Sequence, residues 1–390
     1  MKSWRFRNGI LAAILFVILS LAMLGSGSFD VTSYGAVGDG KTDDSKAFQD
    51  AWAALCQSSS SQPTLQIPRG KTFLVGSPVS FEGPCKSPSV SVKWAGTVIG
   101  PQKTWKGGDG DSWLEFANVD GLSISGNGKI YGQGAIWWKT CSGALRFRSC
   151  NRLRVLGLKS ADSPRNHISI TNCINATFSN LKLTAPEDSP NTDGIDIANS
   201  INIQISNSLM ATGDDCIAIN DGTSHVKITG LTCGPGHGIS VGSLGKEGDE
   251  AVVENIYVKN CTFANTDNGA RIKTWQGGSG FARKITYEDI QLDNVRNPIL
   301  IDQYYCPHQT CANKGKAVGI SDVWFSNFQG TTVDRSAITL NCSNTVPCTN
   351  INLNNIKITA PTNGREEVFA ICNNAYGKSS DTVPVVSCLK

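Results

Sequence analysis

Three short stretches of the chain decide the fold, and they read "DGIDI" (Asp193–Ile197), "DDCIAI" (Asp214–Ile219) and "HGISV" (His237–Val241). Their first isoleucines, Ile195, Ile217 and Ile239, are 22 residues apart at both steps. Each stretch alternates apolar and small or polar residues, which is the pattern of a half-buried strand. A fixed period in the low twenties, made of strands too short to form a core alone, is typical of a stacked solenoid.

The same alternation recurs from about residue 115 onward, in "LSISG", "LRVLGLKS", "ATFSNLKLTA", "INIQISNSL", "VKITGLTC", "IYVKNCTF", "ITYEDIQL", "VWFSNF" and "INLNNIKITA". A sandwich or barrel would need hairpin turns about every 8–12 residues, and the Asn-Gly and Asp-Gly signals are too few. The leucine spacing of a leucine-rich repeat is missing. The sequence therefore predicts an all-β protein, a right-handed parallel β-helix.

The N-terminal stretch "FDVTSYGAVGDGKTDDSKAFQDAWAALC" predicts a strand, a glycine-rich turn and one amphipathic helix. Asp43 or Asp44 is the expected N-cap, ahead of Ala47, Phe48 and Ala51 on the buried side. The open end of a solenoid must be covered, so we expect this helix to cap it. No linker marks a second domain, and residues 28–390 are predicted to form a single β-helix domain.

Residues 1–27 have the layout of a cleavable secretory signal peptide. A basic start precedes an apolar run from Ile10 to Leu24, which is shorter than the roughly 20 residues of a membrane-spanning helix. An uncleaved anchor is the alternative. Cleavage removes three basic residues and no acids, so the formal net charge falls from +3 to zero. Binding of a polyanion must then come from a local patch, and we expect neither nucleic-acid binding nor stable membrane insertion.

Secretion also fits the cysteines, because all 14 lie beyond the signal segment and favour several disulfides. No cysteine pair has the spacing of a zinc site. Three sequons, at Asn175, Asn260 and Asn341, are candidate glycosylation sites in an extracellular protein. We expect a secreted monomer.

The period also aligns acidic residues. Asp193 and Asp214 are 21 residues apart, and Asp215 and His237 are 22 apart. On a β-helix such positions fall on successive turns, separated by about 4.7–4.9 Å. The sequence therefore predicts a surface column of carboxylates ending in an imidazole.

Arg271 and Lys273 are predicted to extend this column. Arg271 follows His237 by 34 residues. The glycine-rich stretch "GSLGKEGDEA" accommodates the surplus over one period as a loop. Because the two cations are two residues apart on a strand, they point to one side and Ile272 points inward.

Several interpretations of the column remain open. Asp and Gly also form turns, and carboxylates also bind calcium, although an adjacent cationic pair suits a calcium site poorly. Stacked like charges raise one another's pKa, so clustered acids supply a protonated and an ionised carboxyl at one pH. Glycoside hydrolysis needs that combination, and the two cations would bind a negatively charged sugar.

Four motifs in their order and spacing resemble the signature of the polygalacturonases, the pectin-cleaving glycoside hydrolases: "SPNTDGID" (Ser189–Asp196), "GDDC" (Gly213–Cys216), "CGPGHGISVGSLG" (Cys233–Gly245) and "RIK" (Arg271–Lys273). The similarity covers nearly the whole mature chain, includes "YGAVGDGKTDD" and "GQGAIWW", and looks closest to the plant type. It implies inverting hydrolysis of α-1,4-linked galacturonic acid in pectin, with no metal or other cofactor.

The resemblance also implies roles for individual residues. Asp214 would be the general acid, Asp193 and Asp215 would activate the water, and His237 would tune or orient the acid. Inversion predicts that the acid lies roughly 6.5–9.5 Å from the water-activating carboxylates.

The substrate carboxylate would be held by Arg271 and Lys273. Tyr305 in "DQYYC" matches the family's cleft tyrosine, although the adjacent Tyr304 leaves the register open and a packing role is an alternative.

The consecutive acids Asp214 and Asp215 raise a difficulty, because neighbours on a regular strand face opposite sides. Both can serve the cleft only if the backbone turns or bulges, and Gly213 is well placed for that. Asp196 is an odd number of residues from Asp193, so we expect it to face away from the cleft and to be structural.

The family pairs the cysteines at Cys216 and Cys233, which would tie the acid turn to the histidine turn. Cys342–Cys348 and Cys372–Cys388 are expected as local pairs.

Two rivals to hydrolysis are left. One is a pectate lyase on the same fold, which would use calcium and an arginine base. The other is a catalytically silent wall protein that binds polygalacturonate. The sequence does not distinguish endo from exo cleavage.

Overall fold

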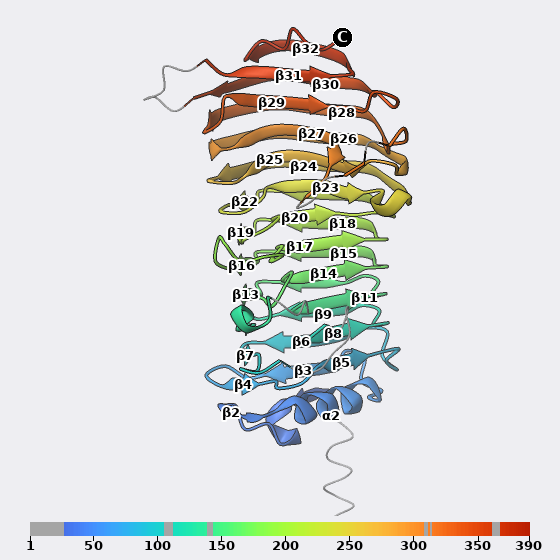
Figure 1. Cartoon of the computed structure of the whole chain (residues 1–390). Coiled ribbons are helices and arrows are strands. Elements are labelled where there is room, and N and C mark those ends of the chain that lie inside the picture. The colour runs from blue at the N-terminus through green and yellow to red at the C-terminus, as the bar shows by residue number, and fades with distance from the viewer. Residues whose placement is uncertain (1–26, 105–111, 139–142, 308–310, 313, 361–366) are drawn as a thin grey trace, which may run out of the picture.

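The structure, a computed structural model, describes residues 27–104, 112–138, 143–307, 311–312, 314–360 and 367–390. Its strands stack in one elongated coil that rises from the N-terminal helix to the C-terminal strands (Figure 1). Neighbouring strands pair in parallel, and Ile195, Ile217 and Ile239 are register partners. The predicted right-handed parallel β-helix is confirmed. The predicted signal segment, apart from Gly27, lies outside the described residues.

One face of the coil is an eleven-stranded sheet, in which each strand comes from a different turn. Its strands are β5 (Val79–Glu82), β8 (Leu114–Ala117), β11 (Leu145–Arg148), β14 (Ile168–Thr171), β17 (Ile195–Ala198), β20 (Ile217–Ile219), β23 (Ile239–Leu244), β25 (Asn268–Trp275), β27 (Asn297–Tyr305), β29 (Ser336–Asn341) and β31 (Phe369–Asn373).

The other strands form a 21-stranded sheet that consists of two columns. The first column holds β1 (Ser28–Asp30), β3 (Thr64–Ile67), β6 (Val90–Trp94), β9 (Leu122–Ser125), β12 (Arg154–Leu156), β15 (Ile174–Ser179), β18 (Ile201–Ser206), β21 (Thr223–Thr229), β24 (Glu250–Ala264), β26 (Ser279–Val295), β28 (Gly319–Thr332), β30 (Cys348–Thr359) and β32 (Ala375–Val383). The second column holds β2 (Asp39–Asp43), β4 (Thr72–Leu74), β7 (Thr97–Ile99), β10 (Lys129–Tyr131), β13 (Lys159–Ala161), β16 (Lys182–Thr184), β19 (Leu209–Ala211) and β22 (Thr232–Cys233). The columns merge at β24, because β21 and β22 both pair with it.

The predicted strand segments after residue 115 are all present, but the solenoid begins earlier than the repeat pattern suggested. Strand β3 already pairs with β6, and β4 pairs with β7. The early turns were missed because their strands, such as "TFL" and "TVI", are only three residues long. Periodicity cannot be read from so short a run.

Stacked apolar residues of successive turns fill the core. Phe81, Phe116 and Phe147 are register partners in the eleven-stranded sheet, with ring centroids 4.4 Å and 5.6 Å apart. Phe178 continues the row at 5.8 Å from Phe147. All four side chains are fully buried. Each turn therefore buries its apolar residues only by lying on its neighbours, as expected for a solenoid.

Corners between the first and second columns turn at residues in the left-handed conformation. Asn180 and Asn207 have φ of 54° and 48°, and Gly157 and Gly230 occupy the same corner of other turns at 76° and 65°. Asparagine and glycine adopt this region most readily. The repeated Asn and Gly between the strand-like segments are therefore the residues that fold the chain into a coil.

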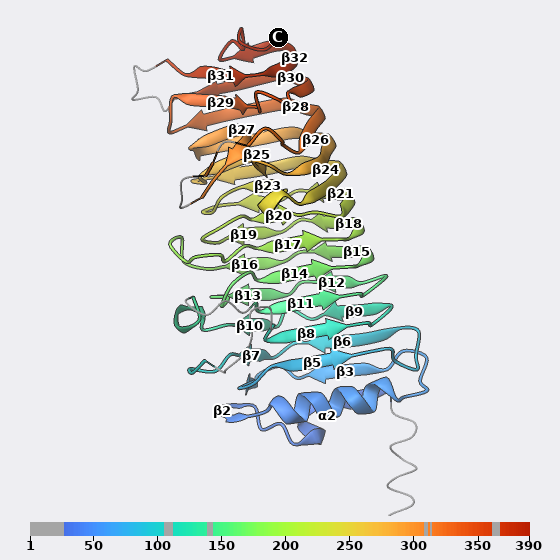
Figure 2. The ribbon, with the colours of Figure 1, turned by 45° about the vertical axis from the view of Figure 1, so that its right-hand side comes forward.

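The N-terminal helix α2 (Ser45–Cys56) covers the first turns, as predicted (Figure 2). Asp44 is its N-cap residue, while the Asp43 carboxylate accepts the N–H of Ser45 at 3.0 Å. Trp52 of α2 packs against Phe81 and Phe116 at 5.3 Å and 5.5 Å between ring centroids. The remaining helical turns are η1 (Val31–Tyr34), η2 (Gly134–Ile136) and η3 (Lys246–Gly248). Among the described residues, no helix is both long and apolar enough to span a membrane.

Within the described ranges, five disulfides tie neighbouring segments together. Three of them, Cys216–Cys233, Cys342–Cys348 and Cys372–Cys388, were predicted. Cys56–Cys85 and Cys306–Cys311 were not assigned from the sequence. Cys150, Cys173 and Cys261 are buried free thiols. Cys216–Cys233 closes a 17-residue loop. By chain entropy it contributes roughly 3 kcal/mol to the free energy of unfolding.

We predict that Phe116→Ala lowers the free energy of unfolding by about 3–5 kcal/mol, because it opens a cavity in the stacked row. Phe369→Ala is the matched control, since that side chain is 40% exposed near the C-terminal end of the coil. Denaturant unfolding of both variants measures the difference. Equal losses would contradict the account of the core.

Candidate active site

A bend between β19 and β20 carries the paired acids Asp214 and Asp215. The backbone N–H of Asp215 donates to Oδ1 of Asp214 at 2.8 Å, and the N–H of Gly213 donates to Oγ1 of Thr192 at 2.9 Å. A Cβ on Gly213 would lie 2.1 Å from the carbonyl oxygen of Ser189, so only glycine fits this approach. The expected turn at Gly213 is confirmed, and it lets consecutive acids serve one site.

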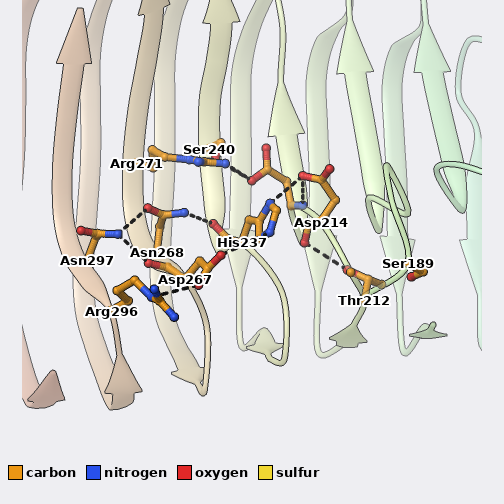
Figure 3. A network of polar contacts seen from close by, with 12 residues as sticks. Ser189, Thr212, Asp214, His237, Ser240, Asp267, Asn268, Arg271, Arg296 and Asn297 are labelled. Carbon is orange, nitrogen blue, oxygen red and sulfur yellow. Dashed lines mark hydrogen bonds and ion pairs between the residues drawn. The ribbon is translucent and has the colours of Figure 1, made fainter. Parts of the chain in front are cut away.

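Asp214 is bonded to His237 of the next turn (Figure 3). Nδ1 of His237 lies 2.9 Å from Oδ1 of Asp214, and the His237 N–H donates to the Asp214 carbonyl at 2.8 Å. Burial raises the pKa of Asp214, but the hydrogen bond and charge of His237 outweigh it and place the pKa below its usual value. The same hydrogen bond raises the pKa of His237. The pair therefore holds a proton on the imidazole side.

Asp215 has a different environment, because two cations and a hydroxyl bind its carboxylate. Arg271 and the Ser240 hydroxyl both donate to Oδ1, the latter at 2.9 Å, and Nζ of Lys273 lies 2.8 Å from Oδ2. Nε of Arg271 also donates to the Ser240 hydroxyl at 2.8 Å. Asp215 is only 1% exposed, so these bonds compensate the burial of its charge.

Asp193 precedes β17 in the turn below Asp215. The N–H of Gly194 donates to the Asp215 carbonyl at 2.9 Å, which fixes the two turns in register. Burial raises the pKa of Asp193 well above its usual range, and the charges of Asp196, Asp214 and Asp215 raise it further. The structure thus brings Asp193, Asp214, Asp215 and His237 together, as the period predicted.

The expectation that Asp196 faces away from the cleft was wrong. Asp196 lies in an outward column with Ala218, Ser240 and Arg271, which are register partners on successive strands. The parity argument assumed one regular strand from Asp193 to Asp196, whereas β17 begins only at Ile195. Burial raises the pKa of Asp196 to about 7, and the charge of Asp215 adds to the rise.

The predicted register of the two cations also needs a correction. Arg271 pairs with Ser240 rather than with His237, so the cations extend the column of Asp196. They nevertheless reach the acids, because both side chains point outward and bind Asp215 while Ile272 is buried. The surplus residues after β23 include the predicted loop, where η3 lies.

Of the two adjacent tyrosines, Tyr305 lies beside the cations. Nζ of Lys273 is 5.2 Å from the centroid of the Tyr305 ring, and Trp275 meets this ring edge to face at 5.3 Å. The Tyr304 hydroxyl instead accepts the backbone N–H of Asn344 at 3.0 Å.

A polar network on the next turns supports His237 and was missed from the sequence (Figure 3). The Asn268 amide donates to the His237 carbonyl at 3.1 Å, and Oδ2 of Asp267 lies 3.5 Å from Nε2 of His237. Arg296 in turn pairs with Asp267 at 3.2 Å. Asp267 and Arg296 directly precede β25 and β27, and Asn268 begins β25. The 22-residue period did not locate them, because the turns after β23 are longer.

Asp214, Asp215 and His237 also form a candidate metal-binding group, because one ligand-type atom of each lies within 4.8 Å of the others. The bonds already described involve these same groups: His237 with Asp214, and Asp215 with Arg271 and Lys273. A divalent cation would have to displace them beside two positive charges, which makes the donor set a poor fit for calcium.

Known proteins resemble this chain in both sequence and fold. The sequence profile described as glycosyl hydrolases family 28 matches residues 56–381. A probable polygalacturonase of Arabidopsis thaliana is 50% identical over 373 residues, which cover 94% of this chain and 81% of the relative. A polygalacturonase of Malus domestica is 44% identical over 362 residues, which cover 89% of this chain and 76% of the relative.

Solved structures with the same fold include an endo-xylogalacturonan hydrolase from Aspergillus tubingensis, with a TM-score of 0.74, 25% identity and coverage of 91% of this chain and 99% of that chain. A polygalacturonase from Erwinia carotovora has a TM-score of 0.67 and 23% identity, and the match covers 87% of this chain and 94% of that chain. The profile match and the close relatives show that this chain is a glycoside hydrolase, and that it belongs to family 28 as a member of the plant-type polygalacturonases.

Proposed function

We propose that this protein is a secreted polygalacturonase that hydrolyses α-1,4 bonds between galacturonic acid residues of pectin with inversion, in the plant cell wall. The observation that carries the proposal is the contrast between two adjacent carboxylates. Asp214 is bonded to a histidine, whereas Asp215 is bonded to an arginine and a lysine. Neighbouring carboxyls in different environments are suited to different roles in acid–base catalysis.

In this proposal Asp214 is the general acid that protonates the leaving glycosidic oxygen. In the free protein the proton is held on His237, whose Nδ1 lies 2.9 Å from Oδ1 of Asp214. The pair can pass this proton through Asp214 when negative charge develops on the leaving oxygen. His237 is thus the positioning and proton-holding partner of the acid.

Asp193 and Asp215 would activate the water on the opposite side of the sugar ring. In the free protein Asp215 is paired with Arg271 and Lys273, so it would act on the water only when these ion pairs loosen. Burial and neighbouring charges raise the pKa of Asp193. Because the charge of Asp215 disfavours a second carboxylate, Asp193 would accept a proton from the water only when Asp215 shares its charge with that water.

Arg271 and Lys273 would also bind the carboxylate of the galacturonate unit at the cleavage point, beside Tyr305. The guanidinium has five N–H donors, and its bonds to Ser240 and Asp215 use two of them. Binding a sugar carboxylate would loosen the ion pairs of Asp215 and free that group to act on water. Substrate binding and base activation would then be coupled.

Secretion is supported by the leader-like residues 1–27 and by five disulfides, which persist in oxidising compartments. Plant polygalacturonases among the relatives support a role in the cell wall.

The reaction type is tested by digesting polygalacturonic acid. Hydrolysis predicts new reducing ends without an unsaturated, ultraviolet-absorbing product, and no loss of activity with a chelator. Inversion predicts that the first product carries the β anomer, which proton NMR detects. An unsaturated product that requires calcium would make the protein a lyase, and binding without new reducing ends would make it a silent wall protein.

Asp214→Asn should lower the turnover number by roughly 10²–10⁴-fold, because the amide cannot donate the catalytic proton. Binding of oligogalacturonides should remain. Asp293→Asn, at an exposed acid outside the site, is the matched control and should leave turnover unchanged. Full activity in Asp214→Asn would refute the assignment of the acid.

The pH dependence tests the proton held by the pair. Because the pKa of His237 is raised, its proton is kept to a higher pH than in a free imidazole and is lost only as the pH rises through that raised value. His237→Asn removes this proton, so the alkaline limb of kcat/KM should move to lower pH. An unmoved alkaline limb would show that another group controls it.

A further inference from the structure

Three exposed lysines lie directly above one another on the second column. Lys129, Lys159 and Lys182 are register partners on the consecutive strands β10, β13 and β16. At about 4.8 Å per strand, they span roughly 10 Å along the coil axis. We call these three residues the lysine ladder.

Such a ladder is electrostatically unfavourable by itself, because like charges opposite one another on neighbouring strands repel. Among the described residues none of the three takes part in an ion pair. Nζ of Lys129 lies 4.7 Å from the ring centroid of Tyr131, which is a weak neutral contact at an exposed site. No ion pair among the described residues therefore offsets the repulsion between these three lysines.

The strands around the ladder carry no acids, although Asp162 directly follows β13 and hydrogen-bonds to Tyr131 of β10. The six strands β7, β10, β13, β16, β19 and β22 of the second column carry neither Asp nor Glu, and the same is true of β9, β12, β15, β18 and β21 of the first column. In Figure 2 the labelled strands β7, β10, β13, β16 and β19 form one stack, and β9, β12, β15, β18 and β21 form the stack beside it. On the first column, Arg154 and Lys227 add two further cations.

The middle turns therefore separate their charges by face. The acids of the candidate site gather by the eleven-stranded sheet, whereas the 21-stranded sheet of the same turns is cationic and rich in Ser, Thr, Asn and Gln. The formal net charge falls from +3 to zero if residues 1–27 are removed, so attraction of a polyanion needs a local patch, and this face could supply it.

We propose that the lysine ladder is a second binding site for an acidic polysaccharide, which holds a polygalacturonate chain on the outside of the coil while another part of a chain occupies the cleft. This inference rests on the proposed function. A row of cations that repeats once per strand suits a polymer with one carboxylate in each sugar unit better than a single small anion. Lysine, a point charge on a flexible stem, can follow such a chain without an exact fit.

The ladder would act by keeping the polymer near the cleft. Because a second contact on the same chain is intramolecular, it raises the local concentration of cleavable bonds without altering the chemistry. Its contribution should be weak for short oligomers and should fall steeply with salt, since exposed charges are screened.

The test is the triple variant Lys129→Gln, Lys159→Gln and Lys182→Gln. Binding to long polygalacturonate at low salt is measured with excess trigalacturonate present to fill the cleft. The variant should bind about tenfold more weakly, and this difference should vanish at high salt. Hydrolysis of short oligomers should be unchanged, so it reports separately on the proposed function and on folding. The melting temperature should not fall, because repulsion is removed.

The matched control replaces three scattered, exposed lysines by glutamine, Lys41, Lys86 and Lys378, for the same change in charge. An equal loss of binding in the control would show that net charge alone causes the effect, and it would overturn the ladder as a site. Wild-type binding by the ladder variant would also overturn it. A ladder variant that loses binding to phosphatidylserine vesicles but not to polygalacturonate would also overturn the proposal.

Discussion

Backbone pairing between successive turns is the constraint on which the rest of this structure depends. Each turn is held in register with the next by parallel ladders, so a residue's position within its turn fixes its neighbours above and below. Ile195, Ile217 and Ile239 meet in this way in the core, and the residues that precede them in each turn meet at the surface. Core and site are consequences of one register.

The same register explains how a charged site can exist on a short-period fold. Stacking places Asp193 and Asp215 on adjacent turns, which alone would be unfavourable. The structure offsets this repulsion with Arg271 and Lys273 of β25, which bind Asp215, and with His237 on the turn above Asp214. The disulfide Cys216–Cys233 and the close approach at Gly213 hold the acid turn in place. The register of the turns therefore positions the acids of the site.

Much of this could be predicted from the sequence, because one number, the 22-residue period, relates most of the residues involved. It placed the acids beside His237 and gave the fold. It failed where the chain departs from regular strands. Asp196 was misplaced because β17 starts only at Ile195, and Arg271 was set against His237 rather than Ser240 because the loop after β23 changes the spacing. The pairing of Asp215 with both cations depends on side-chain reach, which spacing does not reveal.

The central claim is that Asp214 protonates a glycosidic oxygen while Arg271 and Lys273 hold the carboxylate of the adjoining sugar. The most direct test is a crystal structure of the Asp214→Asn protein with a bound oligogalacturonide. The account predicts a glycosidic oxygen within hydrogen-bond distance of residue 214 and a sugar carboxylate in contact with both cations. A chain bound along another face, or one whose carboxylate avoids Arg271 and Lys273, would contradict it.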